Sequence, residues 1–253
     1  MNGFDDEQHS IALSEDGSYT AYSKEYDEHY HSTKDGALSE SLYKHIIPAY
    51  KLTQGKDELH ILDICYGLGF NTLTTIFYYK KYAPEKRLFI CSPELDRSLV
   101  QSLANFNYPQ EFASLREIIE AISRDGIYRD ETLTIEVFLG DAREYIKRFQ
   151  KKFDVVYQDA FSPSVNPMLW TKEYFTDIKN AIKNDGIITT YSTALKTRLA
   201  LYENGFLIYL NKGEQFRNAT LASLRELEDY EFVAMQHKIN CNPNVEPLSD
   251  VSV

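Results

Sequence analysis

The chain has 253 residues, of which 43% are hydrophobic and 26% charged; this suits one sizeable α/β domain with small additions and excludes a chain that is disordered throughout. With 38 acidic and 27 basic residues the net charge is −11, which excludes non-specific nucleic-acid binding because most of the surface would repel phosphates. The three cysteines lack CxxC spacing, which argues against a disulfide framework and a structural metal site. The acidic N-terminus and the absence of an apolar run of about 18 residues predict a cytoplasmic protein without a membrane span.

The first 50 residues are predicted to form an N-terminal extension. Residues 1–10 read as a loose acidic start. Two short strand-like runs, 11–13 and 19–22, flank a Glu-Asp-Gly-Ser turn and predict a β-hairpin. Apolar residues at helical spacing over 38–46 then predict a helix that ends near Pro48.

Strand and helix alternate from about residue 59 onward. The predicted strands are 60–65, 87–92, 133–139, 153–157, 187–191, 206–210 and 231–235. The predicted helices are 71–82, a stretch after 94, 110–123, one from Asp141 through Phe149, 171–182 and 194–203. This alternation predicts a Rossmann-like α/β domain over residues 51–240, with a doubly wound, mostly parallel sheet, and a polar tail over 241–253. Ligands of such sheets bind beyond the carboxyl ends of the strands.

Three strand ends carry residue types that suit an adenosyl cofactor. The first strand leads into the loop Asp63–Asn71, where Gly67 and Gly69 permit close backbone approach at a helix start. The second ends in Glu94, which suits two ribose hydroxyls; the third is followed by Asp141, which suits an adenine amino group or simply a helix N-cap. This order is similar to that of class I methyltransferases, whereas a NAD-type loop needs a third glycine.

The fourth strand ends in the most informative segment, residues 159–171. It combines the strand-end carboxylate of Asp159, two prolines and the only tryptophan of the chain, Trp170. A carboxylate here is predicted to face the reactive end of the cofactor, where it would bind an acceptor amine or help remove its proton. The alternative is an ordinary capped loop in which Asp159 is exposed and Trp170 serves packing.

This segment resembles a signature of the MnmC family of tRNA methyltransferase domains, D-(G/A)-F-(A/S)-P-x-x-N-P-x-(L/M)-W-(T/S). The loop 63–71 matches the family pattern E-x-G-F-G-x-G-x-N with departures. Segments 30–40, with Ser, Gly and Glu in place, and 190–206 match further family patterns. The resemblance covers roughly residues 11–225.

The resemblance implies a class I methyltransferase that moves a methyl group from S-adenosyl-L-methionine to the amine of 5-aminomethyl-2-thiouridine at tRNA wobble position 34. It also implies a stand-alone form without FAD, dependent on other enzymes for the aminomethyl-uridine. The cofactor-binding candidates are Asp63, Tyr66, Gly67, Gly69, Asn71, Glu94, Asp141 and Asp159. The catalytic candidates are Asp159 and Tyr191. The candidates for binding the tRNA anticodon region are Phe161, Trp170, Lys196, Arg198, Lys212 and Arg217.

One departure from the family pattern lies in the glycine loop. Cys65 stands where the family has its first glycine, and Asp63 replaces a glutamate. A Cβ at position 65 would crowd the methionine part of the cofactor if the backbone there needs a positive φ. Two other functions remain open: an aminopropyltransferase-like enzyme with a similar acidic site, and a non-catalytic adenosyl- or RNA-binding protein.

Overall fold

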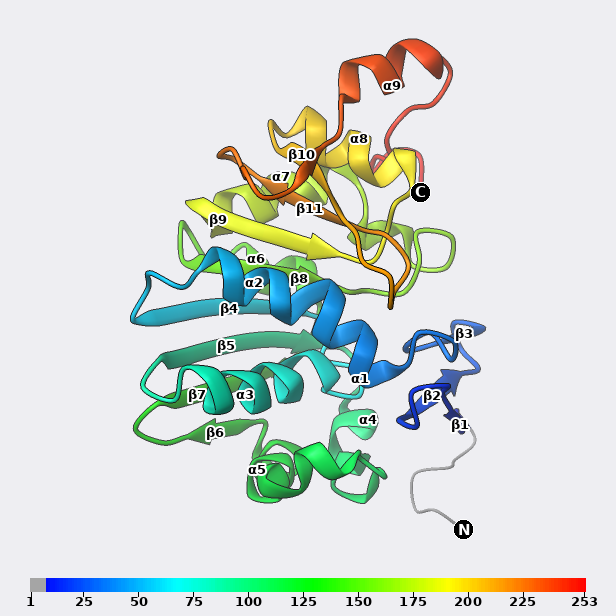
Figure 1. Ribbon diagram of the computed structural model, residues 1–253. Helices are drawn as coiled ribbons and strands as arrows, with labels where there is room; N and C mark the ends of the chain where they lie inside the picture. Colours follow the sequence, from blue (N-terminus) through cyan, green and yellow to red (C-terminus); the bar gives the residue numbers. More distant parts are fainter. Residues whose placement is uncertain (1–7) are drawn as a thin grey trace.

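The structure is a computed structural model and describes residues 8–253 (Figure 1). Over this range nine strands form one mixed sheet in the order β12-β10-β11-β9-β8-β4-β5-β7-β6. These strands are β4 (Glu58–Ile64), β5 (Arg87–Glu94), β6 (Ile127–Arg129), β7 (Leu133–Leu139), β8 (Phe153–Gln158), β9 (Ile182–Thr190), β10 (Leu207–Asn211), β11 (Ala219–Ser223) and β12 (Glu231–Phe232). The central strands β9, β8, β4, β5 and β7 run parallel, and the strands at both edges pair antiparallel. The predicted doubly wound, mostly parallel α/β fold is confirmed.

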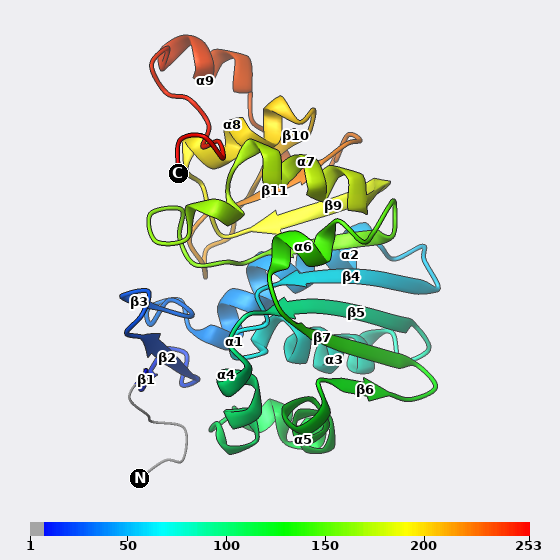
Figure 2. The same cartoon turned by 180° about the vertical axis from the view of Figure 1, so that it is seen from behind.

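Helices cover both faces of this sheet (Figures 1 and 2). One face carries α1 (Ala37–Glu40), η1 (Ser41–Ile46), α2 (Ile47–Leu52), α3 (Phe70–Tyr82), α4 (Arg97–Ser102), η2 (Leu103–Asn105), η3 (Gln110–Leu115) and α5 (Arg116–Asp125). The other carries α6 (Ala142–Ile146), α7 (Lys172–Ala181), α8 (Leu195–Glu203) and α9 (Met235–Cys241), with the short η4 (Pro167–Leu169) before α7. No helix within residues 8–253 combines the length and the apolar content that a membrane crossing requires.

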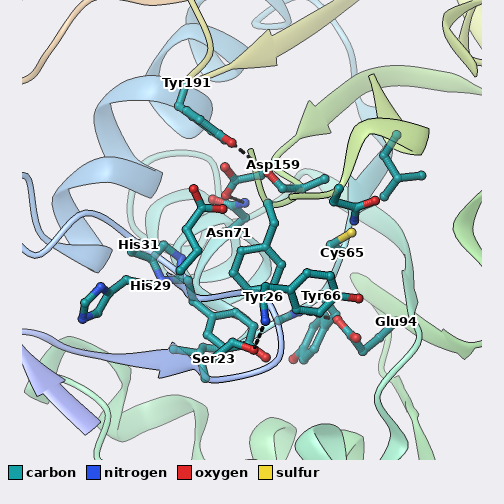
Figure 3. A pocket seen from close by; sticks show the side chains of 18 of the residues that line it. Ser23, Tyr26, His29, His31, Cys65, Tyr66, Asn71, Glu94, Asp159 and Tyr191 are labelled. Carbon is teal, nitrogen blue, oxygen red and sulfur yellow. Dashed lines mark hydrogen bonds between the residues drawn. The ribbon is translucent and has the colours of Figure 1, made fainter. Parts of the chain in front are cut away.

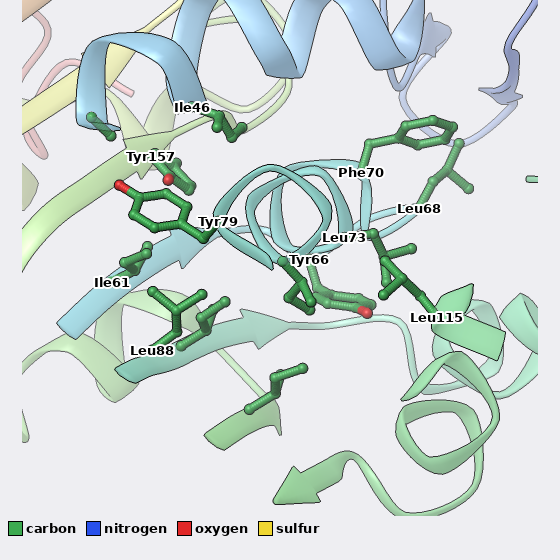
Figure 4. Packing of buried hydrophobic residues seen from close by; sticks show 14 of the residues in the cluster. Ile46, Ile61, Tyr66, Leu68, Phe70, Leu73, Tyr79, Leu88, Leu115 and Tyr157 are labelled. Carbon is green, nitrogen blue, oxygen red and sulfur yellow. The ribbon is translucent and has the colours of Figure 1, made fainter. Parts of the chain in front are cut away.

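The core has two layers because the central strands are buried on both faces. Along β4, Leu59 and Ile61 join the hydrophobic cluster under α2 and α3, in which Figure 4 labels Ile61. Leu62 and Ile64 join the cluster under α7. Successive side chains of a strand point to opposite faces, so a strand that is buried on both sides must be nearly continuously apolar. This explains why the short apolar runs of the sequence located these strands within a few residues.

The N-terminal extension forms a separate small sheet at the carboxyl edge of the parallel strands (Figures 1 and 2). The predicted hairpin is confirmed as β1 (His9–Leu13) and β2 (Tyr19–Ser23), and β3 (Glu28–His29) adds a third strand. The predicted loose start lies mostly outside the described residues, and His9 already belongs to β1. The small sheet thus stands over the edge where ligands of this fold class bind.

The first helix does not end near Pro48, as predicted, but continues to Leu52. Its middle turn is a π-helix, in which the Ile47 N–H donates to the Leu42 carbonyl. Pro48 has no N–H to continue this spacing, and the Tyr43 carbonyl instead accepts a hydrogen bond from Asn211 Nδ2 at 2.9 Å. A hydrogen bond from a β10 side chain therefore replaces the one that proline removes, and the helix continues past Pro48.

Other differences from the predicted elements lie at the sheet edges and the C-terminus. Strands β6 and β11 were not predicted, and the predicted helix 110–123 begins as the 3₁₀ segment η3. The predicted last strand shrinks to β12, with Met235 starting α9. The polar tail packs against the domain: Asp250 pairs with Arg143 and accepts from the Thr171 hydroxyl at 2.7 Å.

Candidate active site

A cavity of about 1170 Å³ opens at the carboxyl ends of the parallel strands, beneath the N-terminal sheet (Figure 3). Its walls come from the loops after β4, β5, β7 and β8 and from the segment 23–33. Pockets for small molecules usually measure roughly 300–1,000 Å³. This cavity is therefore large enough for a nucleoside cofactor together with part of a second substrate.

The glycine loop between β4 and α3 follows a left-handed path. Gly67 has φ +52° and Gly69, the residue before α3, has φ +76°. Cys65 also has a positive φ, +64°, which few residues with a Cβ adopt. The structure thus meets the condition under which a Cβ at position 65 is unfavourable, and Cys65 lines the cavity.

The Glu94 carboxylate holds this loop from the end of β5. Its Oε2 accepts the Gly67 N–H at 2.8 Å and its Oε1 accepts the Asp96 N–H at 2.9 Å. Burial raises the pKa of Glu94, although these backbone hydrogen bonds oppose the shift. Each carboxylate oxygen has a second lone pair, so the group still has acceptors for hydroxyls in the cavity that it lines.

Asp141 serves as the N-cap of α6, the alternative role weighed for it. Its Oδ1 accepts the Arg143 N–H at 2.7 Å. The residue is exposed, and it lines the same cavity as Glu94. Leu95 also lines the cavity and is 69% exposed. An apolar side chain and a hydrogen-bonding acid are thus available for a base at this end.

Asp159 lies at the opposite end of the cavity, where β8 ends (Figure 3). Its Oδ2 accepts from Asn71 Nδ2 at 2.7 Å, and its Oδ1 lies 3.6 Å from His45 Nε2. Burial alone would raise the pKa of Asp159, but the neighbouring His45 and His31 rings and the Asn71 hydrogen bond lower it to about 2. Asp159 is therefore an anion at neutral pH and a weak base.

Asp63 lies behind Asn71 rather than on the cavity wall. It is 1% exposed and accepts from the Thr72 hydroxyl at 2.8 Å and more distantly from Asn71 Nδ2, at 3.4 Å. Burial raises the pKa of Asp63 to about 8, so the carboxyl is protonated at neutral pH. The structure places Asp63 as a support for Asn71 and for the start of α3. Its predicted contact with the cofactor does not follow from this position.

The loop 159–171 is held by contacts in the hydrophobic core and by contacts on the cavity side. Trp170 is fully buried, and its Nε1–H donates to the Phe161 carbonyl at 2.8 Å. On the cavity side, the Phe161 ring stacks on Tyr26 with centroids 4.6 Å apart, and the Ser162 N–H donates to Glu28 at 2.8 Å. Phe161 lines the cavity, whereas the Trp170 indole packs in the core. The substrate contacts of both residues stay predictions.

Tyr191 borders the acceptor end next to Asp159. Its hydroxyl donates to the Ala160 carbonyl at 3.0 Å (Figure 3). Burial raises the pKa of Tyr191, so the phenol stays neutral and cannot act as a base. Its geometry suits a group that positions the Asp159 loop.

The predicted basic cluster does not form as one patch. Arg217 lines the cavity and is held by Asp35 at 3.0 Å and by the Ser32 hydroxyl at 2.9 Å. Lys196 is exposed in the first turn of α8, whereas Lys212 pairs with Glu231. The Arg198 Nε–H donates to the Thr220 hydroxyl at 3.0 Å, and burial lowers the pKa of Arg198. Its guanidinium supports β11 and is not among the residues that line the cavity, and the tRNA contact of Arg198 stays a prediction.

An ion-pair network explains the Ser-Gly-Glu pattern of segment 30–40. Glu40 accepts the Ser32 N–H at 2.8 Å and the Lys44 ammonium at 2.6 Å. Lys44 also pairs with Asp35 at 2.8 Å, and Asp35 with Arg217. Burying these charges is tolerable because each one is paired. The network fixes the N-terminal extension to the loop before β11.

Sequence reasoning missed two histidines beside Asp159. His31 lines the cavity, and His45 is fully buried behind the carboxylate. Neither belongs to a local motif: His45 follows the helical spacing of an apolar face, where a histidine is usually a core residue. Within residues 8–253 no group of three or more His, Cys, Asp or Glu side chains is arranged to hold a metal ion.

Comparisons with known proteins agree with this geometry. Residues 106–225 match a family described as S-adenosyl-L-methionine-dependent methyltransferase. The crystal structure of MnmC2 from Aquifex aeolicus superimposes with a TM-score of 0.82 at 32% identity, covering 97% of this chain and 80% of that one. The match includes the strand ends that form the cavity, because it extends over nearly the whole chain.

Two sequence relatives extend the comparison. An uncharacterised protein of Methanocaldococcus jannaschii is 33% identical over 203 residues, which are 80% of this chain and 55% of the relative. The tRNA 5-methylaminomethyl-2-thiouridine biosynthesis bifunctional protein MnmC of Azoarcus sp. is 30% identical, over 78% of this chain and 32% of that protein. The chain thus spans about half of the first relative and a third of the second. It belongs to the MnmC family of S-adenosyl-L-methionine-dependent methyltransferases and is an enzyme with the class I methyltransferase fold.

Proposed function

We propose that this enzyme methylates the primary amine of 5-aminomethyl-(2-thio)uridine at wobble position 34 of tRNA. The observation that carries the proposal is the Asp159 carboxylate, held by Asn71 and His45 at the acceptor end of the cavity. A fixed anion there suits an amine as the methyl acceptor. The names of the bifunctional relatives, which contain 5-methylaminomethyl-2-thiouridine biosynthesis, support this choice of amine.

The residues on the cavity wall fit S-adenosyl-L-methionine. When bound, this cofactor supplies a methyl group on a positively charged sulfur. Glu94 would accept the ribose hydroxyls, and Leu95 and Asp141 would hold the adenine. Tyr66, Gly67 and Asn71, which line the cavity, would border the methionine part. A side chain at position 67 would press on the Tyr30 ring at 3.1 Å. Neither a flavin nor a metal ion has a part in the proposed transfer.

The acceptor end would orient the amine rather than store its proton. With a pKa of about 2, Asp159 accepts a hydrogen bond from the amine but does not keep its proton. Phe161 and the neutral Tyr191 hydroxyl would border the base and restrict water. Holding the lone pair in line with the methyl group is the main contribution required, since the sulfonium is already activated.

The tRNA would approach over the rim of the cavity. Arg217 at the wall and Lys196 on α8 are the basic groups proposed to meet phosphates of the anticodon region. The net charge of the chain is −11, so most of the remaining surface would repel phosphates. The tRNA would therefore contact the enzyme over a small area. The substrate nucleoside would come from other enzymes that install the aminomethyl group.

A single reaction tests the proposal. The purified protein is incubated with S-adenosyl-L-methionine and tRNA that carries 5-aminomethyl-2-thiouridine, and the nucleosides are analysed by mass spectrometry. We expect a gain of one methyl group at position 34, none on tRNA with unmodified uridine, and no flavin absorption band in the protein. Transfer from decarboxylated S-adenosylmethionine to a polyamine, without methylation of the tRNA, would overturn the proposal in favour of an aminopropyltransferase.

A further inference from the structure

His45 occupies an unusual position for a buried histidine. It lies in the π-helical turn η1 and is 0% exposed. Its Nδ1 lies 2.6 Å from the Thr189 hydroxyl on β9, while its Nε2 has no hydrogen-bond partner among the described residues and points toward Asp159 Oδ1 at 3.6 Å. Leaving a buried polar nitrogen without a partner costs free energy. The group that this nitrogen faces is the Asp159 carboxylate.

Lys44 and Arg217 line the same cavity, but they are paired with Glu40 and Asp35. Burial lowers the pKa of His31 and raises that of Asp63, so both are neutral at pH 7. Burial also raises the pKa of Cys65 and of Tyr191, so the thiol and the phenol that face the carboxylate are neutral as well.

Two neutral side chains complete the surroundings. Asn71 donates a neutral hydrogen bond to Asp159, and the Tyr157 ring on β8 packs against the edge of the His45 ring with centroids 5.5 Å apart. His45 therefore offers the Asp159 anion a buried ring nitrogen at 3.6 Å that has no hydrogen-bond partner among the described residues.

We propose that His45 is a positioning residue that pairs with Asp159 and keeps the acceptor end electrically neutral, so that the site takes up the acceptor amine in its uncharged form. This inference rests on the proposed function, in which the acceptor is an amine. An unpaired buried carboxylate would bind and stabilise the ammonium, which has no lone pair to react. A carboxylate that is already paired with His45 stabilises the ammonium far less, but it still accepts a hydrogen bond from the amine.

The atoms and electrons of the step balance with this arrangement. The ammonium releases one proton to solvent as it enters. The nitrogen lone pair then forms the new N–C bond while the S–C bond breaks and leaves its electron pair on sulfur. The product is a secondary ammonium, whose positive charge replaces that of the sulfonium. His45 neither gives nor receives a proton in this sequence and acts only through Asp159.

The test compares His45→Gln with a matched control, His60→Gln. His60 is also a histidine with one buried ring nitrogen that lacks a partner, but it stacks on Phe89 and does not line the cavity. The probe is sinefungin, an adenosyl analogue in which a primary amine stands in place of the methyl group. Its affinity relative to S-adenosyl-L-methionine, measured by calorimetry at pH 7.5, reports how strongly the site prefers an ammonium, whichever acceptor the enzyme uses.

We expect this affinity ratio to rise by about tenfold or more in His45→Gln, and to stay within about twofold of the parent in His60→Gln. The rise should disappear when Asp159→Asn is added, because the two residues act as a pair. With the aminomethyl-uridine tRNA, His45→Gln should lower kcat and KM together, and its kcat should recover as the pH rises and free amine becomes available.

The outcomes separate the inference from the proposed function. An unchanged sinefungin ratio in a folded His45→Gln variant overturns the inference, even if the parent enzyme methylates the tRNA. A raised ratio supports it, even if the tRNA is not the substrate. If His45→Gln does not fold by circular dichroism, His45→Asn takes its place, and the same ratio decides.

Discussion

The two ends of the cavity are built in different ways. At the adenosyl end, Glu94 and Asp141 each bond to backbone N–H groups within their own or a neighbouring loop. At the acceptor end, Asp159 is held by side chains from η1 and α3. The first end is thus fixed by the path of the main chain, and the second by side chains from distant segments. Substitutions should therefore separate the two ends, affecting affinity at one and turnover at the other.

Asp159→Asn gives the sharpest separation and the largest expected effect. The variant keeps the shape of the side chain but loses the charge that pairs with His45. We expect kcat on aminomethyl-uridine tRNA to fall by ~10²-fold or more because the amine loses its orientation, while the calorimetric Kd for S-adenosyl-L-methionine changes by less than about threefold. A variant that loses cofactor binding would show that Asp159 belongs to the adenosyl end and would break the comparison.

Glu94→Ala should give the opposite pattern. The change removes the acceptor of the Gly67 and Asp96 N–H groups and of the proposed ribose hydroxyls. We expect the affinity for S-adenosyl-L-methionine to weaken by ~1–3 kcal/mol, with kcat at saturating cofactor close to that of the parent. Glu94→Gln keeps one acceptor oxygen and should lose less affinity for S-adenosyl-L-methionine than the alanine variant. Unchanged affinity in the alanine variant would refute the assignment of Glu94.

Asp63 lies beneath Asn71 and should make stability depend on pH. Its pKa is about 8 in the folded protein, against about 3.9 for an unfolded aspartate. Between these values the folded state holds a proton that the unfolded state has lost, so stability falls as the pH rises, by at most about 1.4 kcal/mol per pH unit. The free energy of unfolding of Asp63→Asn, measured in urea, should therefore rise relative to that of the parent between pH 5 and pH 8. A difference that does not vary with pH would contradict the buried, protonated carboxyl.

Cys65→Gly should have the smallest effect. A left-handed φ costs a residue with a Cβ about 1–2 kcal/mol, and the greater freedom of an unfolded glycine offsets roughly 0.5–1 kcal/mol of this. We expect the variant to be more stable by about 1 kcal/mol or less, with equal or tighter cofactor binding. Weaker binding would show that the thiol itself contacts the cofactor; Cys65→Ala, which keeps the Cβ, is the control.

The adenosyl end was predictable from the sequence because each residue follows directly after an apolar strand. Once β4, β5 and β7 were located, the order of the strand ends placed the glycine loop, Glu94 and Asp141 along one edge. Even the strained position of Cys65 could be inferred from the missing glycine. Local sequence and parallel topology were sufficient there.

The acceptor end was predictable only in part. Asp159 followed from strand order, but its partner His45 comes from a helix whose path depends on the π turn before Pro48. Strand β11 was missed because Ala219–Ser223 is short and weakly apolar, and its pairing with β9 and β10 holds it in the sheet. The hydrogen bond of Arg198 to Thr220 on that strand was missed for the same reason.

The π-helical turn determines how the second half of the first helix is rotated about the helix axis relative to the first half. It holds one more residue than an α-helical path would, and each residue advances an α-helix by about 100°. Deleting one residue between Ser41 and Ile46 would let the segment close as an ordinary α-helix. Either His45 would then turn away from Asp159, or Glu40 would turn away from Lys44 and Ser32. The extra residue of the π turn thus lets one helix serve the ion-pair network at its start and the acceptor carboxylate further along.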